Sequence, residues 1–446
     1  MMLKSTLKVV SSTVVRCPAT AAVALGSRVS YATKKQDILS IQPGNDTDKL
    51  IALHDRVVMN TYGRTPGIVL SHGKNAAVWD MRGTEYLDFG SGIAVNALGH
   101  TDAQWLAAVT KQAGLLSHTS NLYFNAPAIR LAQLLVGNSN FDKVFFANTG
   151  TEANEGALKF ARKHGMATSP DKYEIVAFTH GFSGRSMGAL SCTHKSKYRE
   201  IYGPLVPGVK FATYNDIESI RNAIGPNTCG VIVEPVQGEG GLEAATPEFM
   251  KELERLCRAN NALLIADEVQ CGIGRTGELW AHERLGVRPD IMTLAKPLAG
   301  GLAIGAILVT DKVAGVIQPG DHGTTFGGSP LVTAVGSHVF ERIANDQFLG
   351  EVRQKGQHLL KRLQQIQAGS GKPYIKEIRT VGGLFVGVEL DHPVKELISY
   401  ALGAPHHTLF ISAGDNTLRL CPPLTVETKD IDKACNIIDS YFKQRK

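Results

Sequence analysis

The 446-residue sequence lacks several features that mark other classes of protein. No apolar run approaches the ~18 residues of a membrane-spanning helix, so we expect no transmembrane segment. The seven cysteines are scattered without the C-x-x-C spacing of a zinc site or a redox dithiol, so we expect no metal site. Free thiols suit a reducing compartment. With 43% hydrophobic residues, the chain can still bury a sizeable core in two or three domains.

Acidic residues are absent from residues 1–36, which carry six basic ones. Outside this segment 41 basic residues balance 41 acidic residues, so the net charge of +6 resides there and gives no sign of nucleic-acid binding. The segment is rich in Ser, Thr, Ala and Val. Such an acid-free, arginine-containing leader is typical of a mitochondrial transit peptide, with a disordered tail as the alternative. We therefore predict a transit peptide and residence in the mitochondrial matrix.

Short apolar runs alternate with helical patterns across residues 101–330. This alternation favours a large α/β domain with a mostly parallel sheet, whose ligands lie at the carboxyl ends of the strands. We assign 37–100 to an N-terminal segment, with a hairpin over 79–96, and 331–446 to a smaller α+β domain. The expected strands are 144–147, 174–178, 231–233, 263–266, 291–294, 306–309, 383–389 and 417–420. The expected helices are 152–164, 247–260, 330–345, 350–367 and 428–443.

Three polar features each follow an apolar run that we expect to be a strand: Lys296, Asp267 and the pair Gly150-Thr151. Pyridoxal phosphate needs a lysine for its Schiff base, a carboxylate that keeps its ring nitrogen protonated and a turn that holds its phosphate. Each feature alone also has an ordinary explanation. A strand-end lysine usually reaches solvent, and Asp or Thr often caps a helix. The residues by themselves leave both interpretations open.

A second class of protein is suggested by the stretch 272–277, which reads G-I-G-R-T-G and formally matches the dinucleotide fingerprint G-x-G-x-x-G. Three observations argue against an oxidoreductase of that kind. The stretch is not in the first strand–helix unit, Asp267-Glu268 crowds the turn with negative charge, and no clear helix opens at Gly277. We keep it as the weaker alternative.

Ordered sequence blocks over nearly the whole mature chain resemble the class-III pyridoxal-phosphate aminotransferases of fold type I. The resemblance implies a large domain with a mostly parallel sheet and a smaller C-terminal α+β domain. It also implies an enzyme that transfers amino groups. The blocks are YLDF at 86–89, GIAV at 92–95, HTSNLY at 118–123, NTGTEAN at 148–154, HGFSGR at 180–185, EPVQGEGG at 234–241, DEVQCGIGRTG at 267–277, AKPL at 295–298, GDHGTTFGG at 320–328 and GDNTLRLCPPL at 414–424.

The resemblance implies a role for each cofactor residue. Lys296 would form the Schiff base and shuttle the proton, while Asp267 would pair with the pyridine nitrogen. Gln270 would hydrogen-bond the phenolic oxygen and Phe182 would stack on the ring. Thr325 would reach the phosphate from a second subunit, which implies a homodimer with shared sites. The full cofactor set is Gly150, Thr151, Phe182, Asp267, Glu268, Val269, Gln270, Lys296 and Thr325.

The resemblance also implies receptors for acidic substrates. Arg185 is the candidate for the donor's α-carboxylate, with Thr324 close by, because arginine binds carboxylates through two parallel hydrogen bonds. Arg419 would bind the α-carboxylate of glutamate or 2-oxoglutarate, and Glu239 would pair with Arg419 when the neutral end of the donor is present. Without the family order, a structural ion pair would explain each arginine equally well.

Two blocks, 120–123 and 415–420, resemble the acetylornithine branch of this family. We therefore expect transfer of the 5-amino group of acetylornithine to 2-oxoglutarate, as in arginine biosynthesis. Ornithine or another omega-amino acid is the alternative donor. One departure lies beside the catalytic lysine, where Pro297 stands in place of the family's usual glycine and could shift the lysine's backbone.

Overall fold

The computed structural model describes residue 44 and residues 46–445. The predicted transit peptide at 1–36 lies outside the described residues. Contacts divide the chain into two units, Met1–Val69 and Leu70–Lys446. In the first unit, helix α2 (Thr47–Val57) begins at Asp46, whose carboxylate accepts the backbone N–H groups of Asp48 and Lys49. Within the described part of the chain, no helix is both long and apolar enough to cross a membrane.

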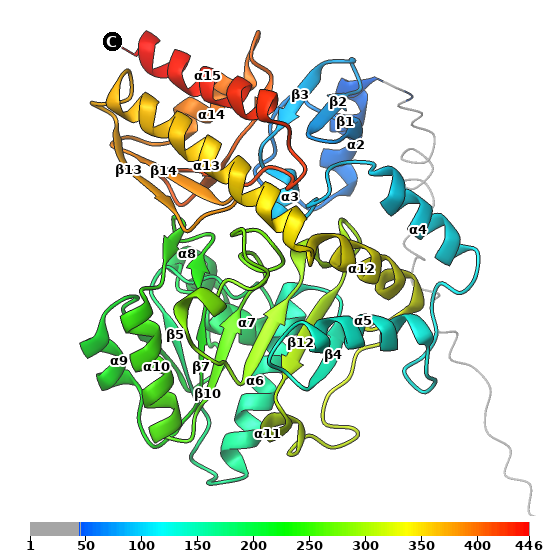
Figure 1. The fold of residues 1–446 in the computed structure, drawn as a ribbon, viewed down its shortest axis with the longest axis vertical. Helices are drawn as coiled ribbons and strands as arrows, with labels where there is room; N and C mark the ends of the chain where they lie inside the picture. Colours follow the sequence, from blue (N-terminus) through cyan, green and yellow to red (C-terminus); the bar gives the residue numbers. More distant parts are fainter. Residues whose placement is uncertain (1–43, 45, 446) are drawn as a thin grey trace, which may run out of the picture. The chain divides into compact units, whose positions relative to one another are not determined.

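A seven-stranded sheet organises the middle of the second unit (Figure 1). Every neighbouring pair is parallel except the two that involve β12, which runs antiparallel to β11 and β4. The prediction of a mostly parallel α/β sheet is therefore confirmed. In spatial order the strands are β4 (Lys143–Ala147), β12 (Gly305–Val309), β11 (Ile291–Leu294), β10 (Leu263–Asp267), β7 (Thr228–Val233), β5 (Glu174–Phe178) and β6 (Val209–Ala212).

Helices pack against this sheet through faces that are buried at helical spacing, as one of them illustrates. Helix α10 (Pro247–Ala259) starts at the Thr246 cap with proline in its first turn and buries Phe249, Leu253 and Cys257. Each such large apolar side chain contributes about 1.5–3 kcal/mol on burial. The other helices before the C-terminal part are α3 (Ser91–Ala94), α4 (Ala103–Ala113), α5 (Ala126–Gly137), α6 (Gly150–Met166), α7 (Met187–Ser191), α8 (Ser196–Arg199), α9 (Ile217–Ala223) and α11 (Asp311–Ala314).

A second, four-stranded sheet joins segments that are far apart in sequence. The predicted hairpin forms from β2 (Ala77–Asp80) and β3 (Glu85–Asp88), preceded by β1 (Leu70–Lys74). The end of the predicted range differs, because residues 91–94 form the short helix α3. Strand β15 (Thr408–Leu409) then pairs in parallel with β3, a contact between residues more than 300 positions apart.

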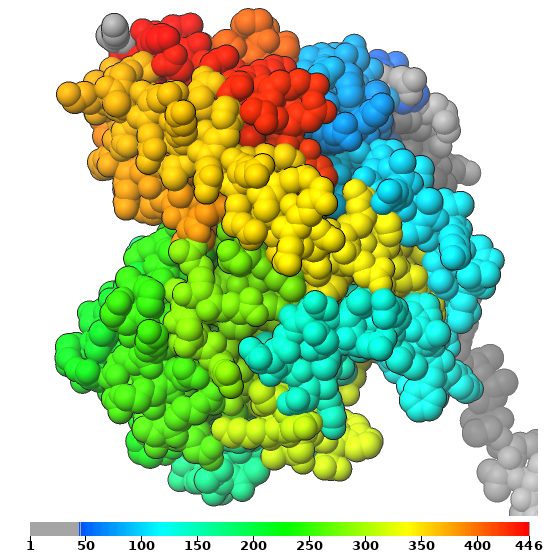
Figure 2. Space-filling model, viewed as in Figure 1, coloured from blue at the N-terminus to red at the C-terminus, as the bar shows by residue number. Residues whose placement is uncertain are grey.

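Of the C-terminal elements, those from residue 346 onward gather beside one another, in yellow, orange and red (Figures 1 and 2), whereas the helix over 330–343 lies against α4 and α5. The predicted strand 383–389 begins later, at Val386, because Gly382 and Gly383 have φ of 109° and 62° and form a turn against the backbone of Thr276. These elements are α12 (Pro330–Ile343), α13 (Asp346–Ala368), β13 (Ile375–Thr380), β14 (Val386–Leu390), α14 (Lys395–Leu402), β16 (Ile411–Ala413), β17 (Thr417–Leu420) and α15 (Thr428–Gln444).

Candidate active site

The functional candidates meet at one edge of the seven-stranded sheet. Asp267 ends β10, and Lys296 opens the short 3-10 helix η3 (Lys296–Ala299) two positions after β11 ends. Gly150 follows β4 and Glu234 follows β7. Because the carboxyl ends of these parallel strands face the same way, residues separated by more than 100 positions share one site.

Lys296 is partly buried, and among the described residues its amine has no hydrogen-bond or ion-pair partner. Burial and the nearby positive charge of Arg419 lower the pKa of Lys296, while the negative charges of Asp267 and Glu234 oppose that shift. The amine is therefore closer to its nucleophilic neutral form than an exposed lysine would be. Pro297 fits the first turn of η3, where a missing N–H costs no helical hydrogen bond.

Asp267 is buried beside the helix that follows β4. Its carboxylate accepts a hydrogen bond from Nδ2 of Asn154 at 2.7 Å and from the backbone N–H of Val269 at 3.1 Å. Burial raises the pKa of Asp267, although both hydrogen bonds favour the charged form. Sequence reasoning assigned no role to Asn154. Its place four residues into α6, on the face that turns toward β10, could not be read without the packing of that helix.

Glu234 is a second, partly buried carboxyl group that the sequence did not single out as a site residue. It accepts the backbone N–H of Phe182 at 2.9 Å and that of Gly238 at 3.0 Å. Burial and the neighbouring charge of Asp267 raise the pKa of Glu234. Glu234 thus ties together the two loops that carry Phe182 and Glu239.

The start of α6 is shaped for close approach by another group. Thr149 caps the helix by accepting the N–H of Glu152. The N–H groups of Gly150 and Thr151 have no acceptor among the described residues and can donate to a ligand. A Cβ on Gly150 would lie 2.6 Å from a methyl carbon of Val269, so a larger residue would force Val269 to move. The Thr151 hydroxyl accepts the backbone N–H groups of Arg185 and Ser186.

Arg185 lies in the loop between β5 and α7, and its side chain is exposed. No carboxylate in the described residues pairs with its guanidinium, which excludes an internal ion pair as the reason for this arginine. The guanidinium carbon instead lies 3.6 Å from the ring centre of Tyr198 and 5.7 Å from that of Phe182. Phe182 is half-buried and lies in the same loop as Arg185.

Arg419 is the buried arginine of the site. It donates to the carboxylate of Glu239 at 2.9 Å, to Oε1 of Gln270 at 3.1 Å and to the carbonyl of Gly238 at 3.1 Å. The first contact matches the pairing that the resemblance implies. Because Oε1 of Gln270 already accepts from Arg419, its amide nitrogen is left to donate to another group.

The remaining predicted residues lie in different surroundings. The carboxylate of Glu268 is fully buried and accepts from the backbone and ring of His282 and from the backbone of Ala281, so it supports the fold behind the site. Thr324 accepts from Asn148 at 2.9 Å, near the start of α6. Thr325 is exposed.

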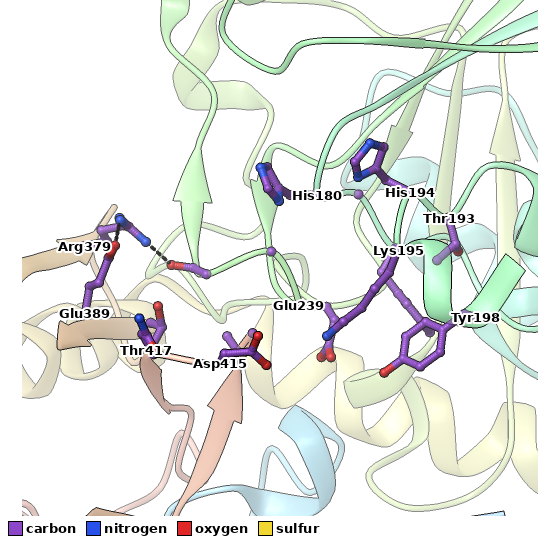
Figure 3. A pocket seen from close by; sticks show the side chains of 17 residues that line it. His180, Thr193, His194, Lys195, Tyr198, Glu239, Arg379, Glu389, Asp415 and Thr417 are labelled. Carbon is purple, nitrogen blue, oxygen red and sulfur yellow. Dashed lines mark hydrogen bonds and ion pairs between the residues drawn. The ribbon is translucent and has the colours of Figure 1, made fainter. Parts of the chain in front are cut away.

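A cavity of about 340 Å³ opens next to Phe182 and Glu239 (Figure 3). Tyr198 and Lys195 lie on one side of it, while Arg379 and its ion-pair partner Glu389 lie on the other. Its walls therefore carry charges of both signs next to the candidate substrate residues.

These residues fit pyridoxal phosphate. The unpartnered amine of Lys296 can react with an aldehyde, and the carboxylate of Asp267 can hold a protonated ring nitrogen. The free N–H groups that begin α6 suit a phosphate dianion, and the spare amide nitrogen of Gln270 suits a phenolic oxygen. Within the described residues, no group of acidic, histidine or cysteine side chains forms a metal site.

The structure does not support a dinucleotide-binding site at residues 272–277. Residues 272–277 form buried turns, and the next regular element is the short 3-10 helix Glu283–Leu285. Arg275 is buried and donates to the carbonyls of Leu384 and Pro422. Arg275 therefore links this stretch to residues 384 and 422 in the C-terminal part of the chain. No helix N-terminus is available at 272–277 for a pyrophosphate.

Comparison with known proteins agrees with this donor set. The family model "Aminotransferase class-III" matches residues 58–442. The chain belongs to this family. It is thus an aminotransferase that depends on pyridoxal phosphate. Its sequence is 58% identical over 428 residues to the "probable acetylornithine aminotransferase, mitochondrial" of Dictyostelium discoideum, covering 93% of this chain and 94% of that protein.

Two further similarities extend the comparison of this aminotransferase. The mitochondrial acetylornithine aminotransferase of Alnus glutinosa is 48% identical over 389 residues, with 86% of this chain and 85% of that protein covered. The crystal structure of an ornithine aminotransferase from Toxoplasma gondii has a TM-score of 0.84 at 31% identity, covering 92% of this chain and 97% of the other. That of an N-acetylornithine aminotransferase from Stenotrophomonas maltophilia has 0.76 at 32%, covering 88% and 98%.

Proposed function

We propose that this aminotransferase moves the 5-amino group of N2-acetylornithine to 2-oxoglutarate in arginine biosynthesis. The observation that carries the proposal is a Lys296 amine with no partner among the described residues, together with two arginines in different states. Arg185 pairs with no described carboxylate and lies against the Tyr198 ring, whereas Arg419 is held by Glu239. The Dictyostelium and Alnus relatives, which carry the acetylornithine name, support the choice of donor.

When bound, pyridoxal phosphate supplies an aldehyde carbon that can take up an amine and a ring that withdraws electrons from the adjacent bonds. Lys296 would hold the cofactor through its Nζ atom, and the same atom would move a proton during the transfer. Asp267 keeps the ring nitrogen protonated, and Asn154 orients Asp267. Phe182 covers one face of the ring.

Five other residues complete the cofactor site in this proposal. Gly150 and Thr151 hold the phosphate at the start of α6, and Val269 packs beneath Gly150. Gln270 donates to the phenolic oxygen. Glu268 contributes from behind, through its contacts with His282.

The arginines select the substrates in two half-reactions. Arg185, with Thr324 nearby, receives the α-carboxylate of the donor. Arg419 receives the α-carboxylate of glutamate or 2-oxoglutarate and is neutralised by Glu239 while the uncharged end of the donor is present. Burying a guanidinium without a partner costs several kcal/mol, so a removable internal carboxylate lets one site accept both kinds of substrate.

A homodimer with shared sites is part of the proposal. Side chains of Leu122, Tyr123, Phe124 and Phe326 are 85%, 70%, 98% and 62% exposed. The two segments that carry them lie together, because Asn121 donates to the carbonyls of Thr324 and Gly327. Exposed apolar side chains grouped in this way are typical of an interface, and Phe326 among them directly follows Thr325, the residue expected to serve the second subunit.

Localisation and domain organisation complete the proposal. Mitochondrial names among the relatives and the acid-free leader support a transit peptide at 1–36 and a place in the mitochondrial matrix. The seven-stranded sheet supports a large cofactor-binding domain over 101–330. The C-terminal sheet, with α13 and α15, supports a small domain over 331–446.

The test is a donor panel on the cofactor-loaded mature protein. Loss of the visible absorbance of the lysine-bound cofactor is followed with acetylornithine, ornithine, 4-aminobutyrate and glutamate. We expect fast loss with acetylornithine and glutamate, and much slower loss with ornithine. Lys296→Ala should show none, while Lys355→Ala, a half-buried lysine elsewhere, should behave as wild type. A preference for ornithine, the activity named for the Toxoplasma neighbour, would overturn the donor assignment alone.

Shared sites are tested by complementation. A Lys296→Ala chain and a Thr325→Asp chain should each be inactive alone. Mixed dimers should regain up to half of the wild-type activity, because one site then combines an intact Lys296 with an intact Thr325. No recovery in a verified mixed dimer would contradict sharing through Thr325.

A further inference from the structure

The setting of Arg185 raises a question of orientation that the carboxylate-receptor role leaves open. Its side chain is long and exposed, and an unrestrained arginine loses considerable rotamer entropy when it binds a ligand. An internal ion pair would restrain it but would also occupy its N–H donors. In the described structure its restraint is an aromatic ring, since its guanidinium carbon lies 3.6 Å from the centre of Tyr198.

Stacking on a ring restrains a guanidinium without using its donors. The five N–H groups of arginine lie in the guanidinium plane, so a ring against the face of that plane leaves them free for a carboxylate. The ring also attracts the positive charge. Tyr198 therefore supplies what a carboxylate receptor needs, which is a fixed position with its hydrogen-bonding edge open.

The segment that carries Tyr198 is itself held in place. The segment that leads into α8 is fastened to the Phe182 loop by a hydrogen bond from the His194 N–H to the carbonyl of Gly181 at 2.9 Å. The Thr193 hydroxyl accepts the backbone N–H groups of Ser183 and Gly184 at 3.0 and 3.3 Å. These contacts hold the start of the segment that carries Tyr198 against the loop of Arg185.

The positive charges around the Tyr198 ring point to an anionic ligand. The ammonium groups of Lys195 and Lys197 lie 5.5 and 5.3 Å from the centre of the Tyr198 ring, and neither they nor Arg185 forms an ion pair with a described carboxylate. Three positive charges around one ring repel one another until an anion neutralises them. Tyr198 and Lys195 also line the cavity that contains Glu239 (Figure 3).

We propose that Tyr198 is a positioning residue that holds the Arg185 guanidinium with its donors open, and so selects amino donors that carry a carboxylate remote from the reacting amine. The inference rests on the proposed function, in which Arg185 receives the donor's α-carboxylate. The Tyr198 hydroxyl has no partner among the described residues, so the ring alone performs this role.

The test compares two donors that differ only in that carboxylate. Acetylornithine carries it, whereas N-acetylputrescine is the same molecule without it. Tyr198→Leu should raise the KM for acetylornithine about 3- to 10-fold, the range expected for loss of one cation–π contact, with little change in kcat. Its kcat/KM for N-acetylputrescine should stay at the wild-type value. Tyr198→Phe, which keeps the ring, should restore the KM for acetylornithine.

Controls separate this effect from a general defect. Tyr202→Leu makes the same change at an exposed tyrosine of the next turn. Cofactor absorbance and thermal unfolding verify that each variant folds, and Tyr198→Gln replaces the leucine variant if that one does not. In an Arg185→Ala background, Tyr198→Leu should have no further effect on the KM.

The outcomes distinguish the inference from the function on which it rests. If Arg185→Ala raises the KM for acetylornithine but Tyr198→Leu behaves like Tyr202→Leu, the positioning role of Tyr198 is wrong and the proposed function stands. If Tyr198→Leu impairs both donors equally, the residue is merely structural. If Arg185→Ala leaves acetylornithine unaffected, the carboxylate receptor itself is misassigned.

Discussion

Asn154 offers the sharpest test of how the protein holds the cofactor's ring nitrogen. Its amide nitrogen donates to Asp267 at 2.7 Å and to the carbonyl of Ser183 at 2.8 Å. Asn154→Ala removes both hydrogen bonds from a buried place. Because burial already raises the pKa of Asp267, loss of this donor shifts that carboxyl further toward its neutral form. A neutral Asp267 is a poorer partner for a protonated ring.

The magnitude follows from the kind of bond that is lost. A hydrogen bond to a charged group contributes about 1.5–3 kcal/mol. If that energy is expressed in cofactor binding, the dissociation constant of pyridoxal phosphate should rise about 10- to 100-fold. The loss should be larger at lower pH, because a carboxyl with a higher pKa becomes neutral earlier as the pH falls.

The assay is a titration of apoenzyme with pyridoxal phosphate, followed by its visible absorbance at several pH values. Asn154→Asp, which puts a second carboxylate at the same place, should bind more weakly than Asn154→Ala. Asn260→Ala is a matched control, since it removes a side-chain hydrogen bond to Leu256 far from the site. Binding by Asn154→Ala within twofold of wild type at every pH would refute the reasoning.

Four further outcomes are expected. Glu234→Gln should lower kcat/KM about 10-fold without loss of folding, because the amide can accept only one of the two backbone N–H groups well. Unchanged steady-state kinetics would contradict the role of Glu234 in holding the two loops together. Apo Lys296→Met should melt at a higher temperature than apo wild type at neutral pH, by an amount that shrinks as pH rises. Burial lowers the folded-state pKa of Lys296, so the folded chain binds fewer protons than the unfolded chain and gains stability with rising pH. Gly150→Ala should cost about 1–3 kcal/mol of unfolding free energy in denaturant titrations and recover partly with Val269→Ala. Phe124→Glu should yield inactive monomers in sedimentation, whereas a persistent dimer would place the interface elsewhere.

The sequence by itself determined the local elements and the chemistry at strand ends. Short, mostly apolar runs specify buried strands, so the predictions for β5 and β11 match the structure residue for residue. Lys296, Asp267 and the pair Gly150-Thr151 were identifiable because each follows such a run within a few residues. A parallel sheet then gathers strand ends at one edge, which predicts their meeting without coordinates.

Only the tertiary structure decided which partners these residues have. Asn154 reaches Asp267 across 113 positions, and Tyr198 of the short helix α8 lies against the guanidinium of Arg185. Among the described residues it also gives Lys296 no hydrogen-bond or ion-pair partner and Arg185 no ion pair, which the sequence could not show. Periodicity reports which face of an element is buried, but not which residue of another element lies against it. That pairing depends on the rotation and register of packed elements, and long-range contacts alone fix it.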